Sequence, residues 1–140
     1  MKKIVFVCLG NICRSPMAEF VMKSLTDQLK IESRATSSWE HGNPIHRGTQ
    51  AIFKKYAISY DRNKTSQQIS PADFADFDYI IGMDESNVRD LKRMAPEDFQ
   101  HKIYQFEEES VPDPWYTGDF DQTYDLVLAG CKKWLERLDG

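Results

Sequence analysis

A cysteine and an arginine near the start of the chain are separated by five residues, in the run Cys8-Leu9-Gly10-Asn11-Ile12-Cys13-Arg14-Ser15. A loop of that length can wrap around one small anion. Gly10 and Asn11 tolerate left-handed backbone angles, which lets successive N–H groups point inward as a nest for an anion. Arg14 adds a planar fork that matches two oxygens of a phosphate, and Ser15 adds a hydroxyl donor. The run therefore predicts a site for a tetrahedral oxyanion.

Cys8 is the residue of this run that can act as a nucleophile. The positive end of a following helix and the Arg14 guanidinium favour its thiolate over its thiol. A thiolate that faces a bound phosphorus is in position to attack it. The alternative is that Cys8 is a small buried strand residue with no chemical role. Nucleotide loops of the Walker and Rossmann types are excluded, because neither G-x4-G-K-[ST] nor G-x-G-x-x-G occurs in the sequence.

Strands and helices that alternate along the chain must position this run. Residues 4–7 are continuously apolar and rich in β-branched side chains, which is typical of a strand buried on both faces. We expect further strands near residues 33–38, 77–83 and 102–106, and helices over residues 15–30, 48–56, 84–94 (capped by Asp84) and 121–138. This alternation predicts an α/β fold with a parallel sheet, in which ligands bind beyond the carboxyl ends of the strands.

The apolar periodicity also predicts which side chains are buried. Residues 59–70 and 107–118 are too polar or too rich in proline to be regular and are expected to be loops. Four-residue intervals in the first helix place Met17, Val21, Leu25 and Leu29 in the core. In the last helix the expected core stripe is Tyr124, Leu128, Cys131, Leu135 and Leu138.

Composition excludes several classes of protein. The 140 residues are 41% hydrophobic and 29% charged, which indicates one globular domain over residues 1–140. The net charge of −4 disfavours a general nucleic-acid binder, and no apolar run is long enough to span a membrane. Three cysteines in a chain of this size favour reduced thiols and a cytoplasmic location. We expect no metal or other cofactor, because the three histidines show no ligand spacing and are read as surface or packing residues: His41, His46 and His101.

Three motifs together resemble the low-molecular-weight protein tyrosine phosphatase family. Residues 7–16 resemble the family's signature, and residues 77–80 followed by 83–87 resemble its middle strand and the next turn. Asp113-Pro114-Trp115-Tyr116 resembles its late Asp-Pro-aromatic loop. The resemblance covers the whole chain, and the motifs agree with it in order and spacing. It implies a four-stranded parallel sheet flanked by helices on both faces, which is a Rossmann-like, three-layer arrangement.

By this resemblance, the chain hydrolyses phosphotyrosine and small aryl phosphates in two steps. Cys8 attacks phosphorus and forms a cysteinyl-phosphate, while Arg14 and the loop N–H groups stabilise the transition state. Asp113 protonates the leaving phenolate and then activates water, with Glu107, Glu108 and Glu109 as rival carboxylates nearby. The residues implied to bind the phosphate are Leu9, Gly10, Asn11, Ile12, Cys13 and Ser15. The implied substrate rim is Leu9, Trp39, Trp115 and Tyr116, although Trp39 fits partial core packing equally well.

The same resemblance gives roles to neighbouring residues. Cys13 is implied to pair with oxidised Cys8 as a disulfide that protects it, and its alternative is a small loop-filling residue. Tyr116 is implied as a phosphorylation site, and Cys131 is expected to be a core residue. Many relatives brace the asparagine that matches Asn11 with a histidine or arginine, but residues 62–65 offer no clear match. Asp84 is read either as a helix cap or as an anchor of the phosphate loop.

Several alternatives to the phosphatase remain. An arsenate reductase on the same fold needs further cysteines near the third strand, and residues 79–94 contain none. A phosphate-sensing or phosphotyrosine-binding module without turnover would not need Cys8, Arg14 and Asp113 together. A sugar-transport subunit that carries phosphate on cysteine would not need the Arg14 fork. As a phosphatase, the chain is expected to be inhibited by phosphate and vanadate, and to be a monomer that self-associates weakly through its aromatic rim.

Overall fold

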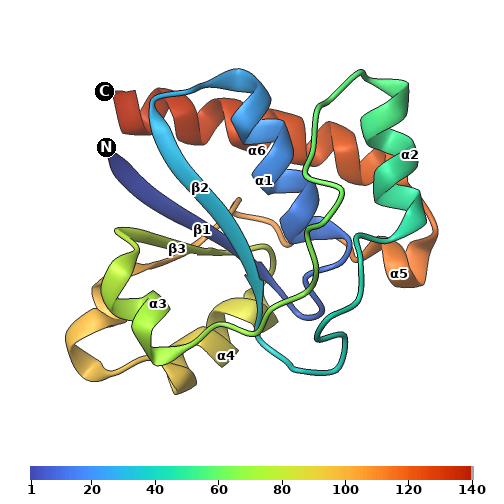
Figure 1. Cartoon of the computed structure of the whole chain (residues 1–140). Helices are drawn as coiled ribbons and strands as arrows, with labels where there is room; N and C mark the ends of the chain where they lie inside the picture. Colours follow the sequence, from blue (N-terminus) through green and yellow to red (C-terminus); the bar gives the residue numbers. More distant parts are fainter. Residues whose placement is uncertain (140) are drawn as a thin grey trace.

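A four-stranded parallel sheet in the order β2-β1-β3-β4 forms the middle layer of the protein (Figure 1). The computed structural model describes residues 1–139. The strands are β1 (Lys2–Cys8), β2 (Leu29–Ala35), β3 (Tyr79–Gly82) and β4 (Ile103–Gln105). The helices are α1 (Arg14–Leu25), α2 (Arg47–Lys55), α3 (Pro71–Asp76), α4 (Glu85–Met94), the 3-10 helix η1 (Glu97–Lys102), α5 (Pro114–Thr117) and α6 (Phe120–Asp139). The predicted parallel sheet and the alternation of strand and helix are confirmed.

The central strand β1 is buried on both faces, as its continuous apolar sequence predicts. Ile4 and Phe6 join the core formed with α1, α2 and α6. Val5 and Val7 join the second core, formed with α3 and α4. Alternate side chains of a strand point to opposite faces, so one short strand holds both helical layers against the sheet. Figure 1 shows α3 and α4 on the side of the sheet away from α1, α2 and α6.

The predicted end of the first helix at residue 30 is wrong. α1 ends at Leu25, and the N–H of Thr26 makes the last helical hydrogen bond, to Met22 O at 3.2 Å. Leu29 begins β2, where it pairs with Lys2 of β1. The four-residue interval from Leu25 to Leu29 is therefore a coincidence across a helix–strand boundary. The second strand also begins and ends earlier than the predicted residues 33–38, because its register with β1 spans Leu29–Ala35.

Three short helical elements lie where no helix was predicted: α3, η1 and α5. The sequence signal for α3 was present. Ser70 accepts from the N–H of Asp73 while the Asp73 carboxylate accepts from the N–H of Ser70, and Pro71 occupies the first helical turn. The third strand is shorter than predicted, since Phe77 terminates α3 instead of starting β3. Residues 107–118 are irregular except for the four-residue helix α5.

The core stripe of α6 is partly different from the predicted one. Tyr124, Cys131 and Leu138 are buried as expected. Leu128 and Leu135 are only partly buried, and Val127 and Trp134 take the central places instead. The Trp134 indole N–H donates to Phe106 O at 2.7 Å, which fixes α6 against the end of β4.

Among residues 1–139, no helix combines the length and the apolarity needed to cross a membrane.

Candidate active site

A pocket of about 140 Å³ opens at the carboxyl end of the sheet, where the sequence predicted a ligand site. Three segments distant in sequence meet there: the loop after β1, the segment after β2 and the loop that leads into α5. The lining residues are Cys8, Leu9, Gly10, Ile12, Cys13, Trp39, Glu40, Asp113, Trp115 and Tyr116. Trp39 is 77% exposed, so the core-packing alternative for it is wrong. Sequence reasoning missed Glu40.

The loop between β1 and α1 turns its carbonyl groups away from the pocket. The carbonyls that accept hydrogen bonds from surrounding protein are those of Leu9, Gly10, Ile12 and Cys13. Their donors are Ser37 (N and Oγ), Ser66 Oγ, His46 N and Thr49 Oγ1. In a planar trans peptide the following N–H points to the opposite side. The N–H that follows the Gly10 carbonyl shows the direction: it belongs to Asn11 and donates to Cys8 Sγ at 3.3 Å.

Cys8 lies at the base of the pocket and is 3% exposed. Its Sγ is 3.0 Å from Ser15 Oγ and accepts the N–H of Asn11. The loop brings the Asn11 N–H to the sulfur through a positive φ of 55° at Asn11, whereas the φ of Gly10 is not positive. A short polar side chain tolerates that conformation. The thiol is therefore surrounded by donors that would stabilise a negative charge on sulfur.

A buried polar network limits the Ser15 hydroxyl to two acceptors. The Glu19 carboxylate can only accept, so it takes the hydrogen of Ser33 Oγ, at 2.5 Å. Ser33 Oγ then accepts from Asn11 Nδ2 at 3.0 Å. Asn11 Nδ2 also donates to Ser15 Oγ at 2.8 Å, so the Ser15 hydrogen is left for Cys8 Sγ or the more distant Arg34 carbonyl at 3.4 Å. The polar network thus connects Glu19 with the thiol, and Asn11 Nδ2 at its centre donates toward both ends.

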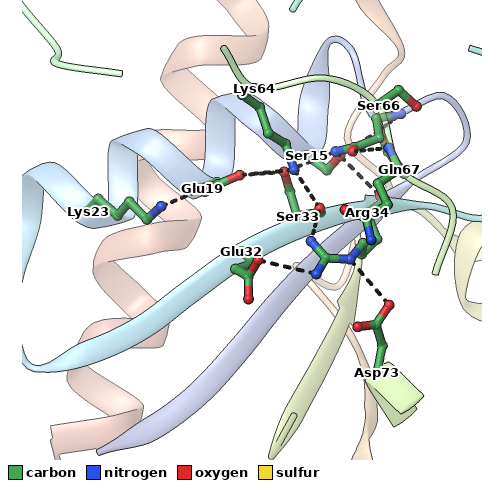
Figure 2. A network of polar contacts seen from close by, with 12 residues as sticks. Ser15, Glu19, Lys23, Glu32, Ser33, Arg34, Lys64, Ser66, Gln67 and Asp73 are labelled. Atoms are coloured by element: carbon green, nitrogen blue, oxygen red, sulfur yellow. Dashed lines mark hydrogen bonds and ion pairs between the residues drawn. The ribbon is translucent and has the colours of Figure 1, made fainter. Parts of the chain in front are cut away.

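The brace of Asn11 that sequence reasoning left unassigned comes from two directions. Ser33 accepts from its amide nitrogen, and its Oδ1 accepts the N–H of Gln67 at 3.1 Å. Lys64 supports the network from behind: Nζ donates to Ser33 O at 2.8 Å and lies 3.8 Å from Glu19 Oε1 (Figure 2). Burial lowers the pKa of Lys64, and the Glu19 carboxylate opposes that shift. Residues 62–65 therefore reach Asn11 only through Ser33 and Glu19.

Arg14 is 2% exposed and is held by two carboxylates and a carbonyl. Its NH1 donates to Asp84 Oδ2 at 2.6 Å and to Val111 O at 3.0 Å, and NH2 lies 3.4 Å from Asp113 Oδ2. Burial opposes the charge of Arg14, but Cys8, Asp84 and Asp113 outweigh it and raise the pKa of the guanidinium. This arrangement fixes the plane of the fork beneath the pocket.

Asp84 performs both of the roles between which the sequence left a choice. Oδ1 accepts from the N–H of Asn87 at 2.7 Å and caps α4, whereas Oδ2 accepts from Arg14. Burial favours its neutral form, but the hydrogen bond and charge of Arg14 prevail and lower the pKa of the Asp84 carboxyl. One carboxylate thus ties the start of α4 to the loop after β1.

Asp113 is the predicted carboxylate that lines the pocket, and Glu107, Glu108 and Glu109 do not line it. Its Oδ1 accepts from the N–H of Trp115 at 3.0 Å and so caps α5. The capping bond orients the side chain, so that Oδ2 faces the Arg14 guanidinium.

The other two cysteines differ in place. Cys13 lines the pocket, and burial, followed by the nearby Cys8 and Asp113, raises the pKa of its thiol. Cys131 is a core residue as predicted: it is fully buried in α6, with Sγ 3.7 Å from Ala18 O. All three cysteines are free thiols.

His46, read from sequence as an ordinary surface or packing residue, connects the loop to the rim. Its N–H donates to Ile12 O at 2.8 Å, and Nδ1 accepts from the N–H of Gly48 and caps α2. The ring stacks on Phe120 at 5.1 Å and meets the edge of Trp115 at 5.7 Å. Within residues 1–139, no group of three or more His, Cys, Asp or Glu side chains is placed to hold a metal ion.

Comparison with known proteins agrees with this geometry. Residues 3–140 match the family described as low molecular weight phosphotyrosine protein phosphatase. A low molecular weight protein-tyrosine-phosphatase, PtpA of Staphylococcus aureus, is 45% identical over 141 residues, which cover 94% of this chain and 90% of PtpA. A solved low molecular weight protein tyrosine phosphatase from Streptococcus pyogenes is 64% identical, with a TM-score of 0.97 over 99% of this chain and 93% of that one. A protein tyrosine phosphatase from Entamoeba histolytica, solved as a product-state mimic, is 32% identical, with a TM-score of 0.91 over 99% of this chain and 96% of that one. The chain belongs to the low molecular weight phosphotyrosine protein phosphatase family.

Proposed function

We propose that the protein hydrolyses phosphotyrosine and small aryl phosphates with Cys8 as the nucleophile. The observation that carries this proposal is the surrounding of Cys8 Sγ, which has the Asn11 N–H at 3.3 Å and the Ser15 hydroxyl at 3.0 Å. Both groups stabilise a thiolate, which is the reactive form of cysteine. Asp113 lines the same pocket and Arg14 NH2 lies 3.4 Å from its Oδ2, which supports roles for these two residues in proton transfer and charge stabilisation.

In the first step, the Cys8 thiolate attacks phosphorus and an S–P bond forms as the P–O bond to the phenol breaks. Asp113, in its protonated form, gives its proton to the departing phenolate oxygen. The N–H groups of residues 9–15 and the Arg14 fork hold the equatorial oxygens, on which charge is spread in the transition state. Because these donors are already fixed by the carbonyl contacts and by Asp84, little reorganisation is needed.

In the second step, water replaces the thiolate. The Asp113 carboxylate takes a proton from water, the new P–O bond forms, and the S–P bond breaks to return the Cys8 thiolate and inorganic phosphate. The Ser15 hydroxyl, directed toward sulfur by Asn11, stabilises the departing thiolate. Ser15 thus assists the release of the thiolate at the end of each catalytic cycle.

The exposed aromatic rim supports a phosphotyrosine substrate. Trp39, Trp115 and Tyr116 are 77%, 56% and 78% exposed at the mouth of the pocket, where they can stack on a phenyl ring. A phenyl phosphate reaches further into a pocket than a phosphoserine does. As part of this proposal, phosphate and vanadate compete for the loop, and the protein acts in the cytoplasm as a monomer that associates weakly through the rim.

The direct test is hydrolysis of p-nitrophenyl phosphate without added metal. Wild type should turn over and should be inhibited by vanadate, Cys8→Ser should be inactive, and Asp113→Asn should lose about 100-fold or more in kcat. Folded wild type without turnover would favour the phosphate-binding module. Turnover that persists in Cys8→Ser would place the nucleophile elsewhere. Arsenate reduction with a thiol donor, measured in parallel, tests the reductase alternative.

As part of the same proposal, Cys13 protects the nucleophile from over-oxidation. Oxidation of Cys8 by peroxide gives a sulfenic acid, and attack by the Cys13 sulfur would release water and form a disulfide that a thiol reductant reopens. After brief peroxide treatment, a reductant should restore activity to wild type and much less to Cys13→Ser. Equal recovery of the two proteins would exclude this role.

A further inference from the structure

A second hollow, of about 750 Å³, lies between α2 and the segment that follows it. One face of α2 forms one wall, with Arg47, Gln50, Ala51 and Lys54 at helical spacing. Residues 57–60 and Arg62 form the other wall. Phe53 and Ile58 give it an apolar floor, so the hollow combines an apolar base with cationic edges.

The three cations of this hollow lack acidic partners. Among the side chains of residues 1–138, no carboxylate lies within 4.0 Å of the charged groups of Arg47, Lys54 or Arg62. The neighbouring Lys55 differs, since it pairs with Asp121 at 2.8 Å. The nearby Asp61 does not line the hollow, and its carboxylate accepts the N–H of Asn63. The protein as a whole is acidic, with a net charge of −4, so this is a local concentration of positive charge.

The hollow begins beside the rim of the catalytic pocket. Arg47 is the first residue of α2, and the residue before it, His46, contacts Trp115 of the rim. From Arg47 the cationic face follows α2 toward Lys54, a length of about 10 Å. The N-terminal end of the cationic face is thus one residue away from the contact with the rim.

We propose that this hollow, defined by Arg47, Lys54 and Arg62, binds an acidic segment that flanks the phosphotyrosine of a protein substrate. The proposal rests on the proposed phosphatase function and adds a substrate preference to it. Carboxylates of such a segment would pair with the three cations, and its apolar side chains would lie on the half-buried Ile58 and Tyr60, which also line the hollow. Small aryl phosphates do not reach the hollow, so they should not respond to it.

The test compares two phosphotyrosine peptides of equal length, one with Asp and Glu on both sides of the phosphotyrosine and one with Asn and Gln. In the triple variant Arg47→Gln, Lys54→Gln, Arg62→Gln, kcat/KM for the acidic peptide should fall about tenfold, through KM. Rates for the neutral peptide and for p-nitrophenyl phosphate should stay at wild-type values. The wild-type preference for the acidic peptide should shrink as salt is raised, because surface charges are screened.

A matched control removes the same number of charges elsewhere. Lys30, Lys92 and Lys132 are exposed cations that do not line the hollow, and the triple change of these residues to Gln should leave kcat/KM for the acidic peptide unaffected. An equal loss in this control would overturn the proposal, because bulk charge would then explain the preference. Equal rates of wild type and the first triple variant on the acidic peptide would also overturn it. Wild type inactive on p-nitrophenyl phosphate would instead refute the proposed function.

Discussion

At the scale of single residues, a substitution of Asp84 can separate its two roles, the capping of α4 and the anchoring of Arg14. Asp84→Asn retains a side-chain oxygen to cap α4 but loses the charge that holds Arg14. We expect kcat/KM to fall at least tenfold, because the guanidinium fork is no longer fixed. The free energy of unfolding should fall by about 1–3 kcal/mol, since a buried cation loses the closer of its two carboxylate partners. Steady-state kinetics and urea unfolding measure the two effects.

The pH dependence of stability provides a check on the same residue. Because Arg14 lowers the pKa of folded Asp84 below its unfolded value of about 3.9, the pair stabilises the protein fully above that pH. The contribution is lost as pH falls through the folded pKa. The stability difference between wild type and Asp84→Asn should therefore be constant from pH 5 to 7 and should shrink below about pH 4. Ser86→Ala, which removes only a hydroxyl bonded to Oδ1, should keep wild-type kinetics, and full activity in Asp84→Asn would contradict the anchoring role.

The residues of the catalytic pocket differ in how far the sequence predicts them. Cys8 and Arg14 belong to one local run, whose types and spacing already specify an anion site. Asp113 was identified by its motif, and its place in the pocket agrees. Ser33 and Gln67 were not predicted, because they reach Asn11 across 22 and 56 positions through the sheet. The register of β2 beside β1 brings Ser33 to the loop, and the bridge between Ala35 and Gln68 brings Gln67 there.

At the scale of elements, β2 and α1 together hold the loop through Ser33. We expect Ser33→Ala to lower kcat about tenfold with little change in KM, because Asn11 loses an acceptor and Glu19 loses a donor. The Asn11 amide, which donates to Ser15 Oγ, is then held less firmly beside the thiol. Stability should fall by about 1–3 kcal/mol, since both remaining polar groups are buried.

A serine outside this network controls for removal of a hydroxyl. Ser24 Oγ donates to Val21 O within α1 and touches none of the loop. Ser24→Ala should therefore keep the wild-type kcat. A wild-type kcat in Ser33→Ala would show that the polar network between Glu19 and Asn11 does not influence the thiol.

The boundaries of elements were harder to predict than their types. Ser70, Pro71 and Asp73 carry a complete capping signal for α3, yet the helix is too short for apolar periodicity to reveal it. The end of α1 was predicted too late because the apolar periodicity of the helix continues to Leu29, although Leu29 belongs to β2 and pairs with β1. Pairing between strands decides such boundaries, and a single sequence does not show it.

At the scale of the whole molecule, the packing of the helical layers on the sheet depends on how closely α6 approaches the sheet. Gly130 lies where α6 passes over the ring of Phe106, and a Cβ at this position would overlap that ring. Phe106 in turn packs edge-on against Phe6 of β1, at 5.9 Å between ring centres. The close approach thus links the C-terminal helix to the central strand, and it explains a glycine inside a long helix.

Gly130→Ala should therefore destabilise the protein although alanine favours helices by about 1 kcal/mol. We expect a net loss of about 1–2 kcal/mol in urea unfolding, because the Phe106 ring or α6 must move to accept the methyl group. Ala129, the exposed residue before Gly130, provides a matched control. Urea unfolding of Ala129→Gly measures the helix-propensity difference between alanine and glycine without a change in packing. Neither Gly130 nor Phe106 lines the pocket at the carboxyl end of β1, so kcat of the folded variant should remain at the wild-type value. A Gly130→Ala protein as stable as wild type, or more stable, would show that α6 has room to shift and that this contact does not limit the packing of the layers.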